Sequence, residues 1–136
     1  MNATIIHRMA LASLSGNLPF LEIVGNLIAE GVEYYRVDYV TRQFAFYGQD
    51  GEVVTAPLVI ENLPPIAPTL NADALRAAIV DSQRHGQKFP RFSVRAMEAG
   101  VQAYYAFLRG KRVTYLGRNG DHHVEWFPGA ELKTGS

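Results

Sequence analysis

An internal repeat constrains the fold of this chain more than any other sequence feature. Shifting the sequence by 69 residues against itself aligns residues 30–52, "EGVEYYRVDYVTRQFAFYGQDGE", with residues 99–121, "AGVQAYYAFLRGKRVTYLGRNGD", without a gap. The matches include Gly31 with Gly100 and Gly51 with Gly120, where turns and helix ends restrict the backbone. The chain therefore has to fold into two similar units.

Each copy predicts two helices followed by three strands. Asn2 and Asn71 stand before helical stretches, where an Asn side chain can accept a hydrogen bond from a free backbone N–H. Pro90 fits the first turn of a helix. We expect helices over 3–14 and 20–30 in the first copy and over 72–84 and 90–99 in the second.

A proline-rich segment separates the copies. Residues 57–70, "PLVIENLPPIAPTL", hold four prolines, which neither a central strand nor a helix tolerates. The repeats are thus expected over 2–56 and 71–128. With 48% hydrophobic residues, the 136-residue chain can bury one core. We therefore predict a single domain over 1–132 and a tail over 133–136.

The turns predict how the strands pair. Asp-Gly at 50–51 and Asn-Gly at 119–120 are typical of two-residue hairpin turns. Residues 32–40 and 101–109 are the richest in aromatic and β-branched residues, so we place them side by side and antiparallel at the centre. The predicted fold is α+β: two tandem helix-helix-three-strand repeats form a six-stranded, mainly antiparallel sheet with helices on one face.

Alternation along the strands divides their side chains between the two faces of this sheet. With two-residue turns, the first copy places Thr55 on the helix side and Val54 and Ala56 on the other. The face away from the helices would gather aromatic and charged side chains, which suits a ligand site or a partner interface. The candidate residues are Tyr34, Arg36, Asp38, Tyr47, Tyr105, Phe107, Thr114, His123 and Glu125.

Two adjacent histidines raise the question of a metal site. His122 and His123 are consecutive on a predicted strand, so they point to opposite faces and cannot bind one ion together. His123 and Glu125 share a face and could hold a common ligand or act as acid and base. We predict no metal, and no sequence motif indicates a cofactor, because both Gly-rich turns lead into hairpins and not into helices.

Charge and composition narrow the partners. Thirteen basic and thirteen acidic residues cancel, so nucleic acid is not an expected partner. Basic residues at Arg109, Lys111, Arg112 and Arg118 are better explained as a solvated hairpin. No run is long and apolar enough for a membrane span. The first sixteen residues do not have the pattern of a secretory signal, so we expect a cytoplasmic protein.

The motifs "GVEYYRVDY", "FYGQDGE" and "GKRVTYLGRNGDHHVEWFP", together with the two-copy layout, resemble the YdfO-like family of small bacterial and prophage proteins, sometimes labelled phage envelope proteins. The resemblance covers nearly the whole chain and implies an α+β domain with a duplicated unit. It implies no activity, cofactor or catalytic residue.

Three functional hypotheses stay open, of which nucleic-acid binding through the basic hairpin of residues 109–118 is the least favoured. The first is a non-enzymatic binding or interaction module, a homodimer in its simplest form, that uses the face around Arg36, Asp38, Tyr105 and His123. The second is a receptor or enzyme for a small anionic ligand, with Arg36 as the anion anchor and His123 or Glu125 as acid or base.

Overall fold

The computed structural model describes residues 1–130 and confirms the α+β fold. The first repeat contains α1 (Ala3–Ser15), α2 (Phe20–Ala29), β1 (Val32–Asp38), β2 (Gln43–Gly48) and β3 (Val53–Pro57). The second contains α3 (Ala72–Arg84), α4 (Phe89–Glu98), β4 (Val101–Phe107), β5 (Arg112–Gly117) and β6 (His122–Trp126). The predicted domain end at 132 and the tail over 133–136 lie outside the described residues.

The helix ends follow the predicted caps. The Asn2 side chain accepts hydrogen bonds from the N–H groups of Thr4 and Ile5, and Asn71 accepts from Ala74 at the equivalent helix start. Gly16 ends α1 in a left-handed conformation with φ 70°. Each first helix therefore begins at an Asn of the repeat.

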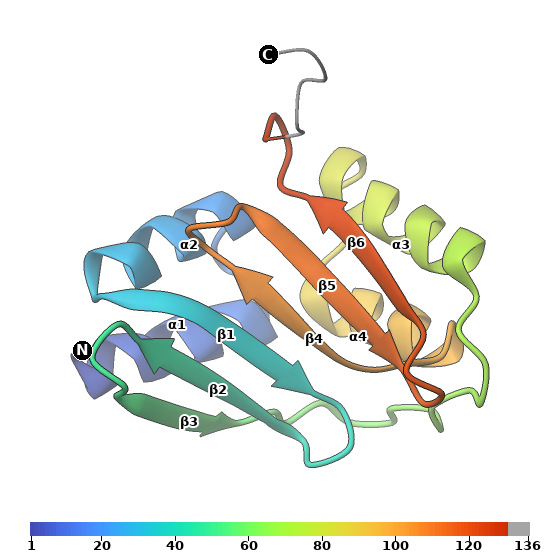
Figure 1. The fold of residues 1–136 in the computed structure, drawn as a ribbon, viewed down its shortest axis with the longest axis horizontal. Coiled ribbons are helices and arrows are strands. Elements are labelled where there is room, and N and C mark those ends of the chain that lie inside the picture. The colour runs from blue at the N-terminus through green and yellow to red at the C-terminus, as the bar shows by residue number, and fades with distance from the viewer. Residues whose placement is uncertain (131–136) are drawn as a thin grey trace.

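The six strands form one antiparallel sheet in the order β3-β2-β1-β4-β5-β6. The two repeats meet at β1 and β4, as predicted, and Arg36 pairs with Tyr105. These are the positions that the 69-residue offset aligns, so an approximate twofold axis passes through the sheet between them. All four helices lie behind the sheet in Figure 1, and the other face is turned to the viewer.

The inner hairpins have longer loops than predicted. Two-residue turns at Thr41-Arg42 and Gly110-Lys111, which are equivalent places of the two copies, would pair Tyr39 with Phe44 and Leu108 with Val113. Instead, Val37 pairs with Phe44 and Ala106 with Val113. Four residues thus connect each strand pair, and the Asp38 carboxylate accepts from the N–H groups of Val40 and Thr41 in the first of these loops. The shift is two residues, so the side chains of 34–38, 43–47, 103–107 and 112–116 keep their predicted faces.

The outer hairpins differ from the prediction by one residue. The loop between β5 and β6 has three residues, because the Gly117 N–H donates to the Asp121 carbonyl and Gly120 takes a positive φ of 84°. Gly48 and Gly51 repeat this arrangement before β3. A shift of one residue moves each side chain of an edge strand to the opposite face. The predicted faces of β3 and β6 are therefore wrong.

In β3, Val54 and Ala56 point to the helix side and Thr55 points away from it. Val54 pairs with Phe46 and Ala56 with Phe44, and both phenylalanines belong to the buried core. The core lies between the sheet and the helices and draws on both repeats. Its largest fully buried side chains include Tyr39, Ile6, Leu27, Leu75 and Met97.

The proline-rich linker runs along one end of the sheet toward α3 (Figure 1). Its apolar side chains pack against the core, and backbone hydrogen bonds join Ala67 to Met97 and Asn71 to Ala99. Gly100 allows the close approach, because a Cβ there would lie 2.4 Å from the carbonyl oxygen of Thr69. Among residues 1–130, no helix has the length and apolar character needed to cross a membrane.

Candidate functional site

The candidate site is the sheet face that the helices leave uncovered, which we call the open face. Because paired residues share a face, the strand register arranges its side chains in three rows that cross all six strands. We call the row of Val53, Tyr47, Tyr34, Phe107, Arg112 and Trp126 the aromatic row. The middle row holds Thr55, Ala45, Arg36, Tyr105, Thr114 and Val124, and the third row holds Pro57, Gln43, Asp38, Ala103, Leu116 and His122.

Neighbours in the aromatic row are in contact across the strands. The Tyr34 ring stacks on Tyr47 with centroids 4.7 Å apart and lies 5.8 Å from the Phe107 ring. The Arg112 guanidinium sits 4.0 Å above the Trp126 ring. These aromatic side chains are only half-buried, so the described part of the chain offers a continuous aromatic surface to a partner.

Arg36 and Asp38 lie next to the aromatic row on β1. The Arg36 Nε is buried and donates no hydrogen bond, and it stands 3.9 Å from the Asp38 Oδ2. That separation is too long for a hydrogen bond. Asp38 uses its Oδ1 to hold the following loop. The open face therefore contains a cationic donor whose need for an acceptor is not met within residues 1–130.

The structure places seven of the nine candidate residues on the open face and the remaining two on the helix side. His123 pairs with Tyr115, whose buried ring packs against Phe92 of α4. Glu125 points the same way, and its Oε2 lies 2.9 Å from the His123 Nε2. The prediction that His123 and Glu125 join Arg36 in one site is therefore wrong, because they lie on opposite sides of the sheet.

The one-residue shift in the register of β6 also brings three residues to the open face that were not predicted there. They are His122, Val124 and Trp126, which pair with Leu116, Thr114 and Arg112. We placed His122 on the packed side, and that placement is also wrong. The local sequence signal is Gly120, since a Gly directly after a type I turn also fits a three-residue loop. His122 and His123 do point to opposite faces, as expected.

The tyrosines divide between the two sides of the sheet. Tyr34, Tyr47 and Tyr105 lie on the open face. Tyr35, Tyr39, Tyr104 and Tyr115 are buried under the helices, and the loss of water around each hydroxyl raises its pKa above the usual value. The Tyr39 hydroxyl donates to the Ser93 hydroxyl at 2.9 Å. These four hydroxyls serve the core and are closed to a ligand.

Three of the four residues in the predicted basic cluster are held by contacts within the chain, and the fourth, Lys111, is exposed. Arg109 pairs with Glu33 at 3.5 Å, Arg112 stacks on Trp126, and Arg118 donates to the Ile66 carbonyl of the linker. They therefore do not form a row of free cations along a groove. In residues 1–130, no three His, Asp or Glu side chains lie close enough together to hold a metal ion.

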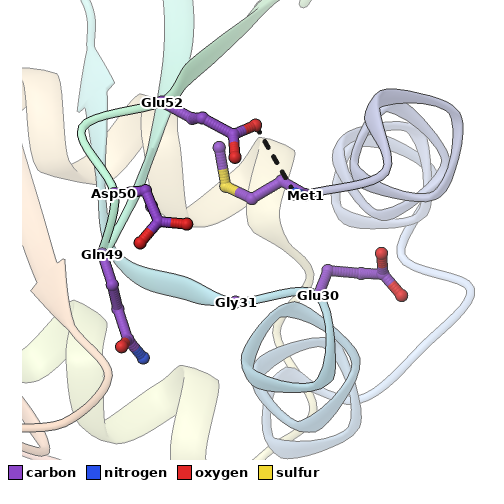
Figure 2. A pocket seen from close by; sticks show the side chains of 7 residues that line it. Met1, Glu30, Gly31, Gln49, Asp50 and Glu52 are labelled. Atoms are coloured by element: carbon purple, nitrogen blue, oxygen red, sulfur yellow. Dashed lines mark ion pairs between the residues drawn. The ribbon is translucent and has the colours of Figure 1, made fainter.

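Two shallow hollows lie away from the open face, each with a volume of about 170 Å³. Figure 2 shows the first, which is lined by Glu30 at the end of α2 and by Asp50 and Glu52 of the loop before β3. Two of these carboxylates already have partners, because Glu30 accepts from the Asn2 N–H and Glu52 pairs with the terminal ammonium of Met1. The second lies between α1 and β3 and is mostly apolar. Both are smaller than typical ligand pockets, which begin at roughly 300 Å³.

The fold and the open face define the chain as a duplicated α+β protein whose sheet is covered by helices on one face only. No protein-family model matches it, and no curated protein matches it either. The resemblance to the YdfO-like family stays a prediction.

Proposed function

We propose that this chain is a non-enzymatic interaction module that binds a protein partner through its open face. The continuous aromatic row is the observation that carries this proposal. Aromatic side chains and arginine are enriched at the centres of protein interfaces, where they contribute much of the binding energy. A sheet face exposed only to water usually carries polar side chains in these positions.

The shape of the open face favours a protein over a small ligand. Small-molecule sites are concave and enclose most of their ligand, whereas the two hollows described above lie away from the open face. With His123 and Glu125 on the other side of the sheet, Arg36 has no acid or base beside it on the open face apart from Asp38. Asp38 in turn is occupied with its loop. The aromatic row therefore suits a flat partner surface.

The overall charge also favours a protein partner over nucleic acid. The chain carries no net charge, so no long-range field draws it to a phosphate backbone. A cytoplasmic location and a prophage origin agree with this proposal and stay predictions.

Photo-cross-linking tests the proposal whatever the identity of the partner. Benzoylphenylalanine in place of Phe107 puts a reactive group in the aromatic row, and the matched control puts it in place of Arg91, which is exposed on α4 behind the sheet. We expect protein adducts from position 107, in purified protein or in cells, and few from position 91. Equal yields at both positions, or no protein adduct from position 107 in either setting, would contradict the proposal.

A further inference from the structure

We infer that the partner on the open face is a second copy of this chain, packed with its aromatic row on the aromatic row of the first. This inference rests on the proposed function and names its partner. The expected assembly is a twofold dimer whose axis runs parallel to the strands, between β1 and β4.

The size of the open face is sufficient for such a dimer. Six strands about 4.8 Å apart and six residues of about 3.3 Å each give a face of roughly 500 Å² per chain. Two such faces bury about 1,000 Å² together, which is the lower limit for a specific interface. We therefore expect a dimer that dissociates on dilution and not a permanent one.

The aromatic row is complementary to a second copy of itself that runs in the opposite direction. The twofold axis places each residue over the residue at the same distance on the other side of the axis. Tyr34 then lies over the partner's Phe107, and Tyr47 lies over the partner's Arg112. Val53, which is 53% exposed, lies over the partner's Trp126. Every contact in the row is aromatic with aromatic, aromatic with cation, or aromatic with aliphatic.

A dimer could also form about a twofold axis that runs across the strands. The charges of the open face favour the axis parallel to the strands. A twofold axis along the aromatic row would place Arg112 directly over the partner's Arg112, and like charges in contact oppose binding. The axis parallel to the strands places Arg112 over a tyrosine and Asp38 over the partner's Ala103. No side chain with a formal charge then lies directly over its like, and the two Arg36 side chains stand about one strand spacing apart on either side of the axis.

The exposed part of the Arg36 side chain gains a polar neighbour in this arrangement. Arg36 and Tyr105 are paired across β1 and β4, next to the axis, so each Arg36 lies over the partner's Tyr105. The Nε is already covered within the single chain, but the Arg36 side chain is 26% exposed, and the outer nitrogens of its guanidinium can donate to the tyrosine hydroxyl. The dimer therefore offers a hydrogen-bond acceptor to the exposed part of the guanidinium.

Single cysteines test the arrangement directly, because the natural chain has none. Thr55 and Val124 are exposed, lie at the two ends of the middle row, and face each other across the proposed axis. We expect a mixture of Thr55→Cys and Val124→Cys chains to give a covalent dimer with a short bismaleimide cross-linker. Each variant alone should give little, because its two cysteines lie at opposite ends of the interface.

The matched control uses the neighbouring position of the same strand. Glu125→Cys places its thiol on the helix side, so its mixture with Thr55→Cys should stay uncross-linked. Sedimentation equilibrium of the unmodified chain should show the mass rising toward two chains with concentration. A monomer at all concentrations, or equal cross-linking in every sample, would overturn the inference. Photo-adducts from position 107 to a different protein alone would overturn it too, while leaving the proposed interaction function in place.

Discussion

Two equivalent glycines provide a matched measurement of how the linker is held. Gly31 and Gly100 occupy the same position of the two repeats, with φ values of 82° and 97°. Around Gly31 an added Cβ would meet nothing within 4 Å, whereas at Gly100 it would lie 2.4 Å from the Thr69 carbonyl oxygen. The variants Gly31→Ala and Gly100→Ala thus share a backbone cost and differ only in the contact with the linker.

The structure gives the expected magnitudes. A left-handed alanine costs about 1 to 2 kcal/mol, and both variants should lose this amount. In Gly100→Ala the linker must also move away, which disturbs the hydrogen bonds from Asn71 to Ala99 and from Ala67 to Met97. At about 1 kcal/mol for each hydrogen bond, this variant should lose roughly 3 to 4 kcal/mol in total.

Urea unfolding followed by circular dichroism measures both free energies. We expect Gly100→Ala to be less stable than Gly31→Ala by about 2 kcal/mol. Equal losses in the two variants would show that the linker is not packed against Gly100, and the close contact between linker and sheet end would be refuted.

Two further predictions concern the two sides of the sheet. The raised pKa of the buried Tyr35, Tyr39, Tyr104 and Tyr115 means that the folded chain keeps protons that the unfolded chain releases above about pH 10. Below that pH these groups should not change the free energy of unfolding. Above it, the free energy of unfolding should fall by about 1.4 kcal/mol per group and pH unit. The tyrosinate absorbance of the four residues should therefore appear only when the chain unfolds. His123→Ala should leave self-association unchanged, because its side chain lies on the helix side, whereas Phe107→Glu should abolish it; sedimentation that shows equal weakening in both would contradict the register of β6.

Much of the fold could be predicted because residues that restrict the backbone occur at equivalent positions in both copies of the repeat. Asn2 and Asn71 mark helix starts in both copies, and a cap that recurs at the same offset is stronger evidence than either cap alone. The central position of β1 and β4 followed from their aromatic and β-branched residues. Both features depend on local chemistry that is visible in the sequence.

The register of the edge strands could not be read in the same way. Asn119-Gly120 fits a two-residue turn as well as a three-residue loop that ends on a left-handed glycine. The alternation in His122–Trp126 favours the wrong register, because it separates the apolar Val124 and Trp126 from the polar His123 and Glu125. The structure turns the polar pair toward the helices, which this partly exposed edge strand tolerates. One extra loop residue was enough to separate His123 from Arg36.

The most direct test of the central claim uses Trp126, which is the single tryptophan of the chain and belongs to the aromatic row. Acrylamide quenching of its fluorescence can be measured over a range of protein concentrations beside the molecular mass. If the open face binds a second copy, quenching should decrease as the mass approaches two chains. Quenching that stays constant while the dimer forms, or a chain that remains monomeric at every concentration, would contradict the account.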